Sequence, residues 1–145
     1  AAHVEVDVEL GTIRVLDFWV VDDCGRVINP LLVDEQIRGG VVQGIGAALY
    51  EQCIYGADGQ LENGSLVDYL VPMASEMPDI HVAHVQTPTS ATTLGARGVG
   101  EAGTVGAAAA IWTAVNDALT PFGVVLSEQP FTPERVLDAL AARKD

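Results

Sequence analysis

The chain has 145 residues, about the length of a single globular domain. Hydrophobic residues make up 49% and charged residues 19%, which predicts a packed core and excludes a disordered chain. Twenty acidic residues against seven basic ones give a formal net charge of −13. Nucleic acids and anionic membranes bind basic surfaces, so neither is expected as a partner. Because the chain begins at Ala1 without Met, we expect a processed chain or a segment of a longer one.

The two cysteines, Cys24 and Cys53, lie far apart and have no paired spacing. They predict two free thiols rather than a disulfide framework or a zinc site. The sequence has neither a basic-then-apolar leader nor an apolar run long enough to cross a bilayer. A cytoplasmic location is therefore expected.

The N-terminal part of the chain predicts a β-hairpin over residues 3–22. Residues 3–9 alternate apolar and polar, mostly acidic, side chains, which is the period of a half-buried strand. Residues 10–12 supply a turn, and residues 13–21 form a second run that becomes more apolar toward its end. Several surplus acids are expected on the outer face of this hairpin.

A long, glycine-rich helix is predicted over Pro30–Glu51, with Asn29 as its N-cap. Four glycines interrupt it: Gly39, Gly40, Gly44 and Gly46. Each glycine costs about 1 kcal/mol relative to alanine inside a helix. So many in one helix imply the close approach of another backbone or of a ligand.

The second half of the chain predicts a strand over residues 80–85 and then a glycine-rich segment, residues 95–106. This segment leads into an apolar helix that ends near Pro121. A short helix is expected over residues 132–140, capped by Thr132. We find no internal repeat and no linker, so residues 1–145 are expected to form one α+β domain. Its predicted elements are the hairpin, the long glycine-rich helix, further short strands, the second apolar helix and the short C-terminal helix.

Residues Gly98–Gly103 match the pattern G-x-G-x-x-G. A dinucleotide site also needs a hydrophobic strand directly before the pattern and a surrounding βαβ unit. Residues 92–97 are not such a strand, and no βαβ unit is predicted here. A nucleotide-binding module is therefore only a minor alternative.

Glu101 is the only acid between Asp79 and Asp117, and it precedes an apolar helix. Its carboxylate is predicted either to cap that helix or to act as a general base in a water-poor glycine pocket. Gly98, Gly100, Gly103 and Gly106 would let a ligand or a second backbone approach.

Gln36 and Gln43 are seven residues apart and share one face of the predicted helix. They are either surface side chains or amides that recognise the edge of a heterocycle. His81 and His84 are predicted on opposite faces of their strand, and His3 lies near the terminus. No metal site is expected from these histidines.

Four segments occur in a specific order and spacing: Val21–Pro30, Gln36–Gly46, Asp68–Pro72 and Gly98–Gly103. Together they closely resemble the C-terminal part of the molybdopterin-binding large subunit of the xanthine dehydrogenase family. That family includes aldehyde oxidases and aerobic carbon monoxide dehydrogenases. The resemblance extends from about Val4 to Leu140.

The resemblance implies a molybdenum-dependent oxidoreductase that oxidises or hydroxylates a small aldehyde, N-heterocycle or similar substrate. It implies that Glu101 is the catalytic base that activates Mo–OH. The residues implied in cofactor binding are Gln36, Gln43, Gly44, Gly98, Val99 and Gly100. No side chain of this chain is implied as a metal ligand.

The implied cofactor is molybdenum-molybdopterin in its cytosine dinucleotide form, with FAD and iron–sulfur clusters on other subunits. The implied partners are the remainder of the large subunit, FAD-binding and iron–sulfur subunits, and a small-molecule substrate. A full large subunit is several times longer, and neither cysteine occupies the position of the cysteine loop that carbon monoxide enzymes need. An alternative is a catalytically incomplete domain that only packs against the rest of the enzyme.

Overall fold

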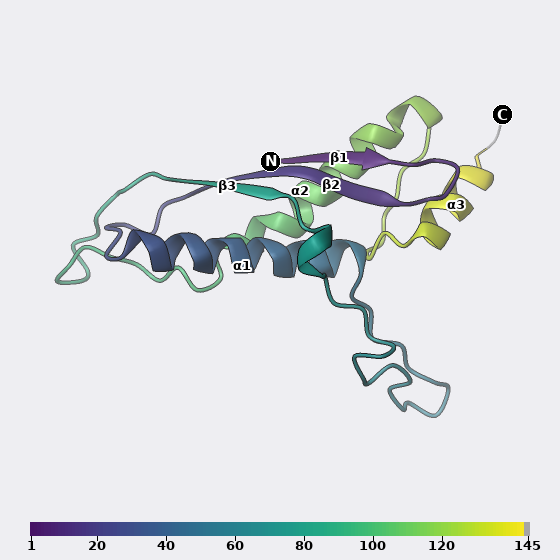
Figure 1. The fold of residues 1–145 in the computed structure, drawn as a ribbon, viewed down its shortest axis with the longest axis horizontal. Coiled ribbons are helices and arrows are strands. Elements are labelled where there is room, and N and C mark those ends of the chain that lie inside the picture. The colour runs from purple at the N-terminus through teal and green to yellow at the C-terminus, as the bar shows by residue number, and fades with distance from the viewer. Residues whose placement is uncertain (144–145) are drawn as a thin grey trace.

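The computed structural model describes residues 1–143 (Figure 1). A three-stranded sheet lies on one side of the molecule, and the two long helices lie against it (Figure 1). The strands are β1 (Ala2–Val6), β2 (Ile13–Asp22) and β3 (Asp79–His84). The helices are α1 (Pro30–Leu49), α2 (Ala102–Leu119) and α3 (Pro133–Ala141), with short 3₁₀ helices η1 (Ala74–Glu76) and η2 (Thr120–Phe122). The predicted α+β class is confirmed.

The predicted hairpin is confirmed, since β1 pairs antiparallel with β2. The first strand is shorter than expected and ends at Val6. The carboxylate of Asp7 accepts hydrogen bonds from the backbone N–H groups of Glu9 and Leu10, both at 2.9 Å, and this turns the chain early. The alternation of exposed and half-buried side chains nevertheless continues to Val8, which explains why the pattern predicted a longer strand.

β3 confirms the strand predicted near residues 80–85, and it pairs parallel with β2 in the order β1-β2-β3. Within residues 1–143 it is the one further strand, where several were expected. Since α1 lies between β2 and β3 in the chain, the three elements form a βαβ unit. This unit was not predicted, because alternation identifies a strand but not its partner.

The predicted helix caps are confirmed at both capped helices. The Asn29 side chain accepts from the backbone N–H of Leu32 at 3.4 Å, and Thr132 accepts from that of Arg135 at 3.3 Å. α1 ends at Leu49, two residues before the predicted end.

α1 and α2 pack against each other through glycine. A Cβ on Gly44 would clash with the Cβ of Ala107, and one on Gly103 would clash with the carbonyl oxygen of Ile37. A Cβ on Gly40 would lie 3.0 Å from the Cα of Gly103. The predicted close approach is therefore that of another helix. The buried side chains of this interface are Ile37, Val41, Ile45 and Ala48 of α1 and Ala107, Ile111, Val115 and Leu119 of α2.

Between α1 and η1 the chain runs outward from the sheet and helices and returns (Figure 1). The buried Asn63 holds this excursion together, donating to the Gln52 carbonyl at 2.6 Å and accepting from the Ile54 N–H at 2.9 Å. Tyr69 ties it to the end of α1, because its hydroxyl donates to the Glu51 carboxylate at 2.7 Å. Among the helices of the described residues, none is both long and apolar enough to cross a membrane.

Candidate functional site

The structure brings together two segments that the sequence singled out. Gln36, near the start of α1, donates through Nε2 to the carbonyl oxygen of Gly100 at 2.9 Å. Only the NH₂ end of an amide can face a carbonyl, so the Gln36 Oε1 points elsewhere. Among residues 1–143 this oxygen accepts no hydrogen bond and is free to bind a ligand.

A cavity of about 430 Å³ lies at this junction. Its size is within the range of small-molecule sites in proteins. Gln36, Val99 and Gly100 line it together with residues from the loop after β2 and from the first turns of α1. The full lining is Cys24, Arg26, Ile28, Asn29, Leu32, Val33, Gln36, Ala96, Arg97, Val99 and Gly100.

The glycine-rich loop is fixed against the loop that follows β2. Arg97 N–H donates to the Cys24 carbonyl at 2.7 Å, and Arg26 N–H donates to the Gly95 carbonyl at 3.0 Å. Gly25 lies between these bonds with φ +71°, and a Cβ there would clash with the Gly95 carbonyl oxygen. Both the backbone angle and the close contact therefore require glycine at this position.

Asp23 supports the same junction. Its carboxylate accepts from the backbone N–H groups of Gly25 at 2.9 Å and Thr87 at 3.0 Å. Hydrogen bonds from Thr87 lower the pKa of Asp23 to about 2, with a further contribution from the Gly25 N–H. The carboxylate stays ionised and holds the loop after β2 beside the loop after β3.

Glu101 is the N-cap residue of α2, but its side chain makes no capping hydrogen bond. Its backbone carbonyl instead accepts from the N–H groups of Thr104 and Val105. The side chain is exposed, so the described residues do not enclose it in a water-poor pocket. The expected capping by the carboxylate is therefore wrong, and the carboxylate is left free beside Gly100.

Gln43 lies further along α1 and meets the start of α2. Its Oε1 is 3.1 Å from the hydroxyl of Thr104, which is also 3.0 Å from the Gly40 carbonyl. Gly44 is buried against Ala107. Neither Gln43 nor Gly44 lines the cavity at Gly100.

The glycines of the 95–106 segment divide into two groups. Gly103 packs against the α1 backbone, whereas a Cβ on Gly98, Gly100 or Gly106 would meet no atom within 4 Å. The open side of Gly98 and Gly100 leaves room for a ligand to approach the backbone.

The histidines lie away from this cavity. His81 and His84 are on opposite faces of β3, as predicted. His81 stacks on Trp19 with ring centroids 5.5 Å apart, and the His84 Nε2 lies 2.7 Å from an Asp34 carboxylate oxygen. No group of three or more histidine, cysteine, aspartate or glutamate side chains within residues 1–143 could hold a metal ion.

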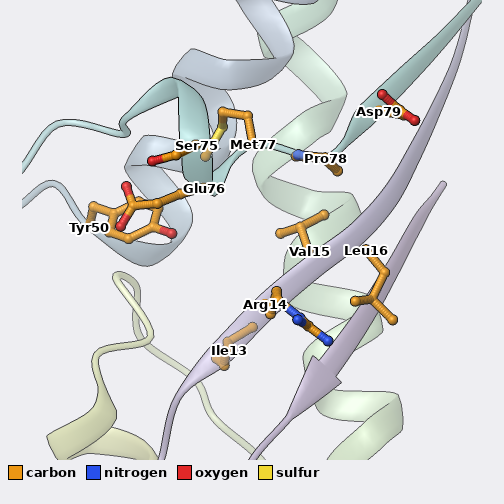
Figure 2. Close-up of a pocket in the computed structure, with 10 residues that line it drawn as sticks. All are labelled: Ile13, Arg14, Val15, Leu16, Tyr50, Ser75, Glu76, Met77, Pro78 and Asp79. Carbon is orange, nitrogen blue, oxygen red and sulfur yellow. The ribbon is translucent and has the colours of Figure 1, made fainter.

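Another cavity has a volume of about 690 Å³. Its lining residues, shown in Figure 2, come from β2, the residue after α1 and the segment from η1 to the start of β3. Arg14, Tyr50, Ser75, Glu76 and Asp79 contribute its polar side chains. None of the site residues predicted from the sequence lines it.

Sequence reasoning missed Arg26, Arg97 and Cys24 as members of the site. Cys24 is buried, and burial raises the pKa of its thiol. The two arginines carried a usable signal, since each is an isolated cation in a strongly acidic chain. Only the fold, however, places them beside Gln36.

Comparison with known proteins supports the resemblance. A family model described as "Molybdopterin cofactor-binding domain" matches residues 1–78. The nicotine 6-hydroxylase large subunit of Paenarthrobacter nicotinovorans is 48% identical over 96% of this chain and 17% of its own length. The carbon monoxide dehydrogenase large chain of Hydrogenophaga pseudoflava is 36% identical over 94% of this chain and 17% of its own length. The chain thus spans about a sixth of these relatives.

A solved structure agrees with these matches. The crystal structure of quinoline 2-oxidoreductase from Pseudomonas putida 86 superposes with a TM-score of 0.94 and 44% identity, covering 97% of this chain and 18% of that one. More than half of the chain matches the family model, and the relatives are large subunits or large chains. The chain therefore belongs to the molybdopterin cofactor-binding domain family, corresponding to part of the large subunit of xanthine dehydrogenase-type enzymes.

Proposed function

We propose that this chain forms part of the cofactor site of a molybdenum hydroxylase large subunit that acts on a small N-heterocycle or aldehyde. The observation that carries the proposal is the hydrogen bond from Gln36 to Gly100, which joins two of the resembling segments at one cavity. The names of two relatives, nicotine 6-hydroxylase and quinoline 2-oxidoreductase, contain N-heterocycles and favour that substrate class.

The residues at the cavity fit a bound molybdopterin cofactor. The free Oε1 of Gln36 can accept a hydrogen bond from the cofactor, and Gly98 and Gly100 leave their backbone accessible. Outside this cavity, Gln43 presents a second amide on the same helix that we propose for cofactor binding, while Gly44 contributes by letting α2 approach α1. When bound, the cofactor supplies the two-electron oxidation. We further propose the cytosine dinucleotide form, with FAD and iron–sulfur clusters on partner subunits that receive the electrons.

Glu101 is the residue we assign as general base. Its carboxylate follows Gly100 directly, is exposed on this chain and is not used to cap α2. It is therefore free to accept the proton of a hydroxyl that attacks the substrate carbon. In the complete enzyme, the remainder of the large subunit would close over this side chain and exclude water.

The test is Glu101→Gln in the complete enzyme. We expect turnover to fall by about 10²–10⁴-fold, because the amide cannot accept the proton, while molybdenum content is unchanged. Glu35→Gln is the matched control, since Glu35 is an exposed carboxylate of α1 paired with Arg38. Turnover that survives Glu101→Gln would contradict the assignment.

A second candidate function is that of a packing domain without catalysis of its own. Several apolar side chains of the outward excursion are exposed, including Leu66 at 82% and Val67 at 87%. Such a group is typical of a surface that packs against another part of a protein, here the remainder of the large subunit. Metal analysis of the purified 145-residue chain separates the two functions. Stoichiometric molybdenum with oxidase activity would refute the second.

A further inference from the structure

The cavity beside Gln36 has an unusual charge for this protein. The chain carries a net charge of −13 and only seven basic residues. Two of them, Arg26 and Arg97, line this one cavity, and no aspartate or glutamate lines it. An acid-free cavity with two cations attracts anions, even in an acidic protein.

Backbone hydrogen bonds bring the two arginines to one junction between loops. Gly25 and Ala96 form an antiparallel bridge, so Cys24 lies opposite Arg97 and Arg26 lies opposite Gly95. Both arginines line the same cavity, so their side chains lie at the same junction.

Both guanidinium groups are available. Among residues 1–143, neither Arg26 nor Arg97 forms an ion pair, whereas Arg14 pairs with Glu5 and Arg38 with Glu35. The nearby Asp23 forms no ion pair with either arginine, and its carboxylate accepts hydrogen bonds from the backbone N–H groups of Gly25 and Thr87. After the hydrogen bonds from Thr87 and Gly25, the charge of Arg97 also contributes to the lowered pKa of Asp23. Asp23 also does not line the cavity.

We propose that Arg26 and Arg97 form a binding site for a phosphate or diphosphate group. Guanidinium binds phosphate oxygens in pairs, and the cavity of about 430 Å³ has room for the group beside Gln36. The source of this phosphate rests on the proposed function: it is the phosphate group of the molybdopterin cofactor. Arg26 and Arg97 would then hold the anionic end of the group that Gln36 and Gly100 contact.

The first experiment titrates the purified chain with inorganic pyrophosphate by calorimetry at low ionic strength. We expect binding to the wild type, a loss of about tenfold or more for Arg26→Gln or Arg97→Gln, and no measurable binding to the double variant. Arg38→Gln is the matched control and should bind as the wild type does. Absence of binding to the wild type, or equal binding to the double variant, would overturn the proposal.

Lysine variants and an acetate titration serve as two further controls. Arg26→Lys and Arg97→Lys keep the charge but lose the paired hydrogen bonds of guanidinium. We expect each lysine variant to bind pyrophosphate with an affinity between those of the wild type and the matching glutamine variant. This result would support the site even if the glutamine variants failed to fold. Acetate should bind far more weakly than pyrophosphate. Equal affinities would overturn the phosphate assignment.

The complete enzyme then tests the source of the phosphate. We expect the double variant to lose molybdenum and organic phosphate together during gel filtration, while the wild type retains both. If the wild type contains molybdenum and the double variant retains the same amount, the cofactor is not the source of the phosphate. A wild type without molybdenum would contradict the proposed function itself. In that case pyrophosphate binding would support a site for another phosphate compound.

Discussion

Among single side chains, Asp23 has the clearest structural role. Its carboxylate accepts backbone hydrogen bonds from both the loop after β2 and the loop after β3. Hydrogen bonds from Thr87 lower its pKa to about 2 from its ordinary value of 3.8. A carboxyl whose pKa is lowered by folding stabilises the protein above its unfolded pKa. That stabilisation is lost as the pH falls from about 4 through about 2.

We predict that Asp23→Asn lowers the melting temperature at neutral pH and flattens its decline between about pH 4 and pH 2, because the amide carries no charge to lose. Thermal unfolding followed by circular dichroism across this range measures both effects. Asp58→Asn is the control for the loss of one exposed turn carboxylate, which accepts a hydrogen bond only from the Gln60 N–H within its own turn. An identical profile for Asp23→Asn would show that the two loops are held by other contacts.

Tyr69 offers a second residue-level prediction. Its hydrogen bond to Glu51 raises its pKa to about 12. The contact therefore stabilises the protein fully below about pH 10, and the stabilisation is lost as the pH rises through about 12. We predict that Glu51→Gln lowers the pKa of Tyr69 toward 10, as followed by NMR of the labelled tyrosine ring. Tyr55 is the internal control, and a Tyr69 pKa that stays near 12 would argue against this bond.

For whole elements, the contact between α1 and α2 yields a matched pair of substitutions. Gly44→Ala places a methyl group against Ala107, whereas Gly39→Ala in the same helix meets nothing within 4 Å. Overpacking costs about 1–3 kcal/mol and outweighs the gain in helix propensity, which is about 1 kcal/mol. We expect Gly44→Ala to lower the free energy of unfolding and Gly39→Ala to raise it, as measured by urea denaturation.

Because both substitutions lie in α1, they gain the same helix propensity and differ only in whether the new methyl group meets α2. Equal stabilisation by both substitutions would mean that α1 and α2 can move apart to admit a methyl group. Equal destabilisation would mean that glycine at position 39 has a role beyond the contacts described above.

Elements could be predicted from the sequence to the extent that local chemistry defines them. Asn29 and Thr132 cap their helices as predicted, because the cap is formed with a residue three positions away. The early end of β1 depends on one Asp7 carboxylate, which the alternating pattern does not reveal. The parallel pairing of β3 with β2 was missed, because no local signal identifies a partner so distant in the chain.

For the molecule as a whole, the excess of negative charge predicts a response to salt. A net charge of −13 destabilises the compact state through self-repulsion. Raising the ionic strength from about 0.01 M to about 0.15 M shortens the Debye length from about 30 Å to about 8 Å. We expect the melting temperature to rise with sodium chloride over this range, as measured by scanning calorimetry. A falling melting temperature would mean that favourable ion pairs dominate instead.

At the candidate site, too, residues within sequence motifs could be predicted, whereas residues brought together only by the fold could not. Gln36, Val99 and Gly100 were implied by the resemblance and meet at one cavity. Arg26 and Arg97 were not predicted, because their proximity depends on a bridge between loops about seventy residues apart. Glu101 was identified, but its freedom from helix capping required the structure.

The parallel pairing of β2 with β3 also constrains the order of folding. The hairpin of β1 and β2 needs only a short turn, but β3 can join β2 only after residues 23–78 have been brought back across the sheet. Closing a long loop costs entropy before the new contacts repay it, so such pairings form slowly. The loops at Gly25 and Ala96 meet beyond this last strand. The cavity beside Gln36 should therefore be among the last parts of the protein to form, and a nascent chain could bind a ligand there only once β3 is in place.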